Sequence, residues 1–205
     1  MKRIFVTGIS TEVGKTMASA IIVEALEADY WKPIQAGDLE HSDSHKIAAL
    51  ISNKRTVIHK NSYALHTPMS PHAAAYIDGI SIQLKNIREP QTSNHLVIEG
   101  AGGLLVPLNA KDTILDLIKP DYKVVVVSRH YLGSINHSLL TIGWLQDKGY
   151  EVSVLFSGDK HPSTEEIILS KTGIQSIGRI EEEQNFDRAL IRKYASQFKE
   201  NLLAL

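Results

Sequence analysis

Hydrophobic residues along the chain fall into two patterns that alternate from the amino terminus onward. Short runs of β-branched and aliphatic residues indicate strands, whereas stretches with apolar residues at every third or fourth position indicate helices. The predicted strands are Arg3–Thr7, Asp29–Ile34, Leu96–Glu99, Lys123–Ser128, Val152–Phe156 and Gln175–Ile180. The predicted helices are Lys15–Glu27, Ser44–Ile51, Ile80–Arg88, Thr113–Ile118, Asn136–Lys148, Ser163–Lys171 and Phe186–Phe198. Segment 61–71 is predicted to be a loop because it contains Pro68 and Pro71.

Several predicted strands are apolar throughout rather than alternating, as in Val124–Val127. Such a run is buried on both faces, which is typical of a parallel sheet covered by helices. We therefore expect an α/β fold: a doubly wound, mostly parallel sheet with helices on both faces and right-handed crossovers. The chain has 205 residues, of which 43% are hydrophobic and 22% charged, so we expect a single domain spanning residues 1–205.

Composition limits the classes of function. The net charge is −1, so the overall charge does not favour binding to nucleic acid or to an anionic membrane. The absence of cysteine excludes disulfides, thiol nucleophiles and cysteine-ligated metals, and it argues against a glutamine-hydrolysing module. The apolar run at the amino terminus is too short for a signal peptide or a membrane span, so we expect a cytoplasmic protein.

The first predicted strand and helix flank a glycine-bounded loop, residues 8–16, with the sequence Gly-Ile-Ser-Thr-Glu-Val-Gly-Lys-Thr. This order predicts a phosphate cradle, because backbone N–H groups and the positive end of the helix point at an anion. Lys15 is expected to reach the outer phosphates and the Thr16 hydroxyl to bind Mg²⁺. Five residues separate the first glycine from Gly-Lys, one more than in the standard motif. The alternative is a strand–turn–helix that merely ends in Gly-Lys-Thr.

Three oxygen-bearing residues follow different strands of the predicted sheet, namely Thr16, Asp43 and Glu99. Ligands lie outside the carboxyl ends of the strands in such sheets, and a hydroxyl with two carboxylates suits Mg²⁺. The sequence therefore predicts a magnesium site. Two structural alternatives stay open: Asp43 serves only as a helix cap, or Glu99 has no partner cation although its burial would then be costly.

Lys32 follows the second predicted strand and precedes a proline. Beside a phosphate loop we interpret it as an anion ligand that neutralises charge in a phosphoryl-transfer transition state. The alternative is a lysine that snorkels to solvent. Gly100, Gly102 and Gly103 let the backbone approach a ligand closely, or they form a plain tight turn.

A second helix start follows the fourth predicted strand, at residues Gly133–Asn136. Its free N–H groups suit a small carboxylate, although Ser134 could simply cap the helix. His41 and His45 have the i, i+4 spacing of a zinc site, but no third ligand has suitable spacing.

Six motifs, in this order, resemble those of the dethiobiotin synthase family within the P-loop NTPase superfamily. They are Gly-x-x-Thr-Glu-Val-Gly-Lys-Thr at 8–16, Lys-Pro-x-x-x-Gly at 32–37, Ser-Asp at 42–43, Ser-Pro-His at 70–72, Glu-Gly-Ala-Gly-Gly at 99–103 and Leu-Gly-x-Ile-Asn-His at 132–137. The resemblance covers roughly the first 145 residues and implies the three-layer, Rossmann-like P-loop architecture. The final 60 or so residues carry little recognisable signature.

The resemblance implies an ATP-dependent cyclo-ligase of biotin biosynthesis that uses Mg²⁺ and no biotin prosthetic group. Its substrates would be 7,8-diaminononanoate and CO₂ or bicarbonate, and its products dethiobiotin, ADP and phosphate. A substrate amine forms a carbamate with CO₂, ATP converts it to a carbamic–phosphoric anhydride, and the second amine closes the cyclic urea. The protein mainly positions and neutralises these groups. The family works as a homodimer with its sites at the interface.

The resemblance also implies a role for each matching residue. Catalytic roles go to Lys32, Lys15 and Thr11. The nucleotide would be bound by Glu12, Val13, Gly14, Lys15, Thr16, Met17, Asp43, Glu99, Gly100, Ala101, Gly102, Ser157, Gly158, Ile180 and Glu181. The substrate would be bound by Thr11, Lys32, Ala36, Gly133, Ser134, Ile135 and Asn136, the last four from the partner subunit. Thr16, Asp43 and Glu99 would hold Mg²⁺.

Three positions depart from the family pattern. Ala36 stands where a Ser or Thr often touches the substrate, so only its backbone could serve. Ser157 stands where an Asn commonly binds adenine, and Glu181 replaces the proline of an Ile-Pro pair that flanks the base. A serine makes fewer fixed hydrogen bonds than an amide. Our hypothesis is a relaxed choice of nucleotide base, with ATP still the usual donor.

Three other classes compete with this prediction. A relative of cobyrinic acid diamide synthase would need an amidotransferase partner domain, for which the chain is short and lacks cysteine. A guanine-selective switch would carry Asn-Lys-x-Asp, but residues Asn53–Thr56 have Thr at the last position. A partitioning ATPase would carry a second lysine early in the phosphate loop, where this chain has Ile9 and Ser10. An inactive binding module would not need Lys15 and its neighbours intact.

Overall fold

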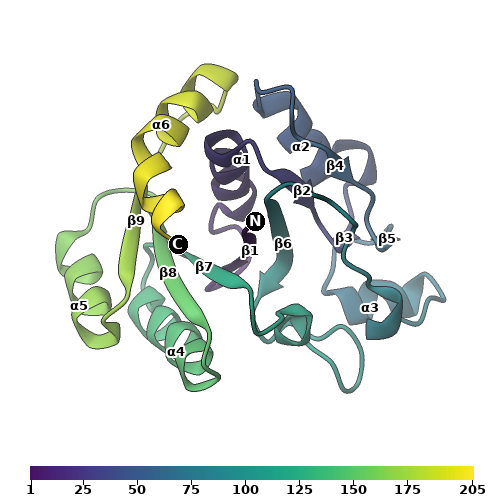
Figure 1. Ribbon diagram of the computed structural model, residues 1–205. Helices are drawn as coiled ribbons and strands as arrows, with labels where there is room; N and C mark the ends of the chain where they lie inside the picture. The colour runs from purple at the N-terminus through teal and green to yellow at the C-terminus, as the bar shows by residue number, and fades with distance from the viewer.

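The structure is a computed structural model that describes residues 1–205. Its centre is a seven-stranded sheet with the strand order β4-β2-β6-β1-β7-β8-β9, and all paired neighbours run parallel (Figure 1). The strands are β1 Arg3–Gly8, β2 Asp29–Trp31, β4 Ile58–His59, β6 Leu96–Gly103, β7 Lys123–Arg129, β8 Glu151–Ser157 and β9 Gln175–Ile180. A separate pair of parallel strands consists of β3 Ile34–Ala36 and β5 Tyr63–Leu65.

Helices cover both faces of the central sheet. They are α1 Lys15–Leu26, α2 Asp43–Leu50, α3 Pro71–Ile77, α4 Ser134–Asp147, α5 Pro162–Thr172 and α6 Arg188–Ala204, with short 3₁₀ turns at Leu39–His41, Leu84–Asn86 and Ile114–Leu117. Helix α1 packs against α2 and α6 on one side of the sheet, and α4 packs against α5 on the other (Figure 1). The prediction of a doubly wound α/β fold is confirmed.

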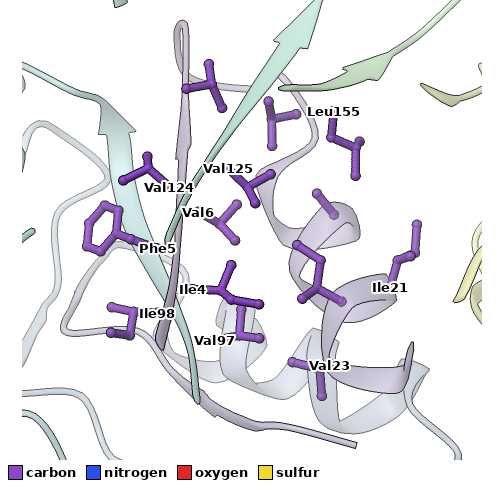
Figure 2. Close-up of a cluster of buried hydrophobic side chains, with 14 of the residues drawn as sticks. Ile4, Phe5, Val6, Ile21, Val23, Val97, Ile98, Val124, Val125 and Leu155 are labelled. Carbon is purple, nitrogen blue, oxygen red and sulfur yellow. The ribbon is translucent and has the colours of Figure 1, made fainter. Parts of the chain in front are cut away.

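The core lies on both sides of β1 and its neighbours (Figure 2). Ile4 and Val6 point toward α1, whereas Phe5 lies on the opposite side of the strand. The valines of β7 between residues 124 and 127 are at most 1% exposed, as the continuous apolar run predicts. Burying both faces fixes the sheet and makes its carboxyl edge a rigid base for a site.

The predicted strand Asp29–Ile34 is in fact two strands. Pro33 has no backbone N–H to continue a ladder, so β2 ends at Trp31 and the chain turns into β3. Strand β3 pairs with β5, which lies inside segment 61–71, so the prediction of a continuous loop there was wrong. The local pattern missed β5 because its pairing is long-range.

The predicted helix Ile80–Arg88 was also wrong. Only a 3₁₀ turn forms, at Leu84–Asn86, and Ile82 is buried although it lies before this turn, where the chain has no regular secondary structure. The predicted helix Thr113–Ile118 is likewise a 3₁₀ turn. Helix α3 was not predicted, although Pro71 occupies its first turn, where a proline's missing N–H costs nothing.

Candidate active site

The glycine-bounded loop joins β1 to α1 at the carboxyl edge of the sheet. A Cβ on Gly8 would lie 2.6 Å from the Val13 side chain, so only glycine fits. Gly14 caps the start of α1 with a φ of 92°, a conformation that favours glycine. The Lys15 ammonium folds back to donate a hydrogen bond to the Ser10 carbonyl at 3.0 Å. Its burial lowers its pKa to about 8.

Side chains from four parts of the chain meet beside this loop. Thr16 comes from α1, Asp43 begins α2, Glu99 lies on β6, and Lys32 follows β2. The Glu99 Oε1 atom accepts hydrogen bonds from Thr16 Oγ1 and from Lys32 Nζ, both at 3.0 Å. Lys32 also forms an ion pair with Asp43. The predicted magnesium ligands and the predicted catalytic lysine thus form one connected cluster.

Lys32 is a buried cation held between two carboxylates. Burial alone would lower its pKa, but the charges of Glu99 and Asp43 raise it above the ordinary value. Burial would raise the pKa of Asp43, but the charge and hydrogen bond of Lys32 bring it below the ordinary value. Lys32 therefore stays positively charged and does not snorkel to solvent, since it is 5% exposed. Ser42 is the N-cap of α2 and Asp43 its first residue, and the Asp43 carboxylate pairs with Lys32, so Asp43 does not serve only as a cap.

The donor set at this cluster fits Mg²⁺. It offers two carboxylates and a hydroxyl, all hard oxygen ligands, and Mg²⁺ normally completes its shell with water and phosphate oxygens. The structure contains no group of three or more His, Cys, Asp or Glu side chains that could hold a metal ion. The residues whose chemistry fits such an ion are Thr16, Asp43 and Glu99.

A cleft of about 1370 Å³ opens over the cluster. Most residues predicted for the nucleotide and substrate line it, namely Thr11, Glu12, Gly14, Lys15, Thr16, Met17, Lys32, Ala36, Asp43, Glu99, Ala101 and Gly102. Sequence reasoning missed other lining residues: Gln35, Lys46, Met69, segment 104–107, and His137, Leu140, Thr141 and Trp144 of α4. The motifs at 32–37, 70–72 and 132–137 had pointed to the neighbourhood of Gln35, Met69 and His137. The remaining ones reach the cleft through tertiary packing.

The other predicted site residues do not line this cleft. Val13 is 1% exposed, and Gly100 is packed so closely that a Cβ would lie 3.2 Å from Phe5 and Ile114. Residues Gly133–Asn136 form the start of α4, where Gly133 is the cap with a φ of 101°. Their helix continues into the cleft wall.

The residues predicted near the nucleotide base lie at the ends of β8 and β9. The Ser157 hydroxyl donates a hydrogen bond to the Val13 carbonyl at 2.9 Å, so it fixes the position of the phosphate loop. The Gly158 N–H donates to the Ile180 carbonyl at 2.9 Å, which joins the two strand ends. The Glu181 side chain is 54% exposed, and its carboxylate forms an ion pair with Arg179 at 3.3 Å.

Curated proteins with similar sequences share one name. This chain is 59% identical over 98% of its length to an ATP-dependent dethiobiotin synthetase from Christiangramia forsetii, of which 98% is covered. It is 45% identical to the enzyme of that name from Cytophaga hutchinsonii, with 98% of each chain covered, and 38% identical to that from Chlamydia pneumoniae, with 98% of this chain and 90% of the relative covered. The chain belongs to the ATP-dependent dethiobiotin synthetase family. The model of a family described as an AAA domain also matches, over residues 2–189.

Solved structures with the same fold are more distant in sequence. A plasmid partition protein from Borrelia burgdorferi bound to AMPPNP has a TM-score of 0.58 at 14% identity, with 99% of this chain and 97% of that chain covered. The MinC:MinD cell division complex of Aquifex aeolicus gives 0.57 at 15% identity, with 100% and 97% covered. At these identities the likeness shows the fold alone. No helix of the structure is both long and apolar enough to cross a membrane.

Proposed function

We infer that this chain is an ATP-dependent dethiobiotin synthetase that carboxylates 7,8-diaminononanoate with CO₂ and closes the cyclic urea. The observation that carries this conclusion is the Lys32 ammonium, buried between Glu99 and Asp43 beside a phosphate loop. Such a cation has no role in hydrophobic packing, and burying it costs free energy unless anions neutralise its charge. A reaction in which a carbamate is phosphorylated brings two anions to one place.

The chain's own residues account for binding and charge neutralisation. The loop N–H groups, the start of α1 and Lys15 would hold the β- and γ-phosphates. Lys32 would lie between the carbamate and the γ-phosphate, with Thr11 on the carbamate side. A carbamate oxygen attacks the γ-phosphorus and ADP leaves; the second amine then attacks the carbonyl carbon and phosphate leaves. Mg²⁺, held by Thr16, Asp43 and Glu99, would offset charge on the phosphate oxygens.

The rest of the cleft suits an aliphatic chain with a polar end. Leu105, Leu140 and Trp144 expose apolar surface there. Leu132 and Ile135 expose further apolar surface around the start of α4, and Leu132 is fully exposed. This surface supports a homodimer in which Gly133–Asn136 of a second copy receive the substrate's carboxylate. We propose that residues 1–205 act as one ATP-binding synthase domain in such a dimer, without a biotin prosthetic group; location in the cytoplasm stays a prediction.

Base selectivity is proposed to be relaxed. The Ser157 hydroxyl already donates to the Val13 carbonyl, so it is not free to donate to a base. Glu181 is solvent-exposed and gives the base no rigid apolar wall. Comparable kcat/KM values for ATP and CTP are expected, and a strong preference for ATP would contradict this proposal.

The experiment that tests the function measures phosphate release from Mg-ATP with and without 7,8-diaminononanoate and bicarbonate, with mass detection of dethiobiotin. Release should depend on the diamine and be lost in Lys32→Ala. The matched control is Lys54→Ala, an exposed lysine outside the cleft, which should behave as the wild type. Diamine-independent hydrolysis, or none, would favour a nucleotide switch or a binding module.

A further inference from the structure

Tyr30 is a fully buried tyrosine whose hydroxyl contacts the candidate metal site. Its hydroxyl donates a hydrogen bond to Glu99 Oε2 at 2.8 Å. The other carboxylate oxygen, Oε1, accepts from Thr16 and Lys32. The two oxygens of Glu99 are therefore held differently, and Tyr30 is the hydrogen-bond donor to Oε2.

The sheet register explains how Tyr30 reaches Glu99. Tyr30 on β2 pairs with Val97 on the parallel strand β6. Glu99 lies two residues further along β6, so its side chain leaves the same face of the sheet. Figure 2 shows Val97 on the α1 side of the sheet, which is also the side from which Thr16 approaches. A tyrosine is long enough to span this diagonal, and its hydroxyl arrives at the carboxylate.

The contact gives Glu99 a fixed orientation. A carboxylate that is 1% exposed needs donors for both oxygens, because a buried acceptor without a partner is costly. The Tyr30 hydroxyl is the donor that Oε2 receives. With Oε2 occupied, Oε1 is the oxygen directed at the side where Thr16 and Lys32 lie.

We propose that Tyr30 is a positioning residue that holds Glu99 so that Oε1 alone is presented to the divalent cation of the nucleotide complex. This inference rests on the proposed magnesium site. Residues that hydrogen-bond a metal ligand from outside its shell typically change metal affinity about 10- to 100-fold when they are replaced. Tyr30 is fully buried and does not itself line the cleft, so it would act on the site through its hydrogen bond to Glu99.

The test measures the affinity for AMPPNP by calorimetry, once with excess Mg²⁺ and once in EDTA. The ratio of the two dissociation constants is the factor by which Mg²⁺ tightens nucleotide binding. Tyr30→Phe, which keeps the ring and leaves no large cavity, should reduce this factor about 10-fold or more and leave the affinity in EDTA unchanged. The Mg²⁺ concentration for half-maximal dethiobiotin formation should rise in parallel.

Tyr122→Phe is the matched control. Tyr122 is 2% exposed and its hydroxyl also donates to a carboxylate, Glu89 Oε2, at 2.6 Å, but away from the cleft. Both variants should lower the melting temperature, and only Tyr30→Phe should change the Mg²⁺ factor. A merely structural role for Tyr30 predicts a loss of stability with an unchanged factor, and that result would overturn the inference.

Glu99→Gln separates this inference from the proposed function. If it lowers the Mg²⁺ factor and Tyr30→Phe does not, the metal site stands and the role of Tyr30 is rejected. If Glu99→Gln leaves the factor unchanged, both are rejected. Should Tyr30→Phe fold poorly, the double variant Tyr30→Phe/Glu99→Gln removes the buried charge that lacks a donor at Oε2. Its factor should equal that of Glu99→Gln alone, and a further loss would show that Tyr30 does not act through Glu99.

Discussion

Replacing Lys32 should destabilise the protein as well as inactivate it. Lys32 is 5% exposed, and it is the cation that pairs with Glu99, which is 1% exposed. Lys32→Met keeps much of the side chain's volume but leaves the buried Glu99 carboxylate without its counter-charge. Breaking a buried pair in this way costs about 3–5 kcal/mol in the free energy of unfolding. For a chain of this length, each kcal/mol corresponds to about 2–4 °C, so the melting temperature should fall by roughly 10 °C.

The assay is thermal unfolding of the metal-free protein, followed by circular dichroism, with two companion variants. Lys46→Met removes a half-exposed lysine that lies 3.7 Å from Asp43, and it should cost less than about 1 kcal/mol because exposed pairs contribute little. Lys32→Met/Glu99→Gln should recover part of the loss, since one unpaired charge is gone. A melting temperature for Lys32→Met within about 2 °C of the wild type would refute the reasoning, because Glu99 would then need no cation.

Three further predictions concern other residues. Burial lowers the pKa of Lys15 to about 8, so its charge is lost above that pH. The affinity for AMPPNP, measured by calorimetry, should therefore fall about 10-fold per pH unit above pH 8. An affinity that does not change with pH would contradict this prediction. Burial opposes ionisation of Glu89, but the hydrogen bonds that its carboxylate accepts lower its pKa from 4.5 to about 2. The ionised carboxylate therefore stabilises the fold fully above pH 4.5, and the difference of about 1–2 kcal/mol in unfolding free energy between wild type and Glu89→Gln should close as the pH falls toward 2. Urea titrations measure this difference, and a difference that stays constant with pH would count against the prediction. Gly178→Ala would put a Cβ 2.4 Å from the Phe198 ring and should lower the free energy of unfolding by about 2 kcal/mol or more. The control Gly149→Ala, at a glycine with positive φ and open space around it, should lower it by about 1 kcal/mol. Equal losses of stability in chemical denaturation would rule out the clash.

Much of the fold was predictable because its signals are local. The run Val124–Val127 predicts a strand buried on both faces, and the order of strand, glycine-bounded loop and helix predicts β1 and α1 nearly to the residue. The predictions failed where pairing is long-range. Strand β5 exists because β3 lies beside it. Ile82 is buried from a segment without regular secondary structure, although the periodicity predicted a helix there.

The candidate site divides in the same way. The sequence by itself determined which chemistry is present, since Lys15, Thr16, Lys32 and Asp43 each stand at a strand end or helix start that local patterns identify. Glu99 was predicted to end its strand, but β6 continues to Gly103, so the end of that strand was predicted too early. Only the tertiary structure decided how these groups are paired. The Lys32 ion pairs and the Tyr30 hydrogen bond to Glu99 depend on the β2–β6 register, and the α4 wall of the cleft depends on how that helix crosses the sheet. The physical reason is that residue type and spacing fix what a side chain can donate or accept, whereas its partner is set by the packing of segments far apart in the chain.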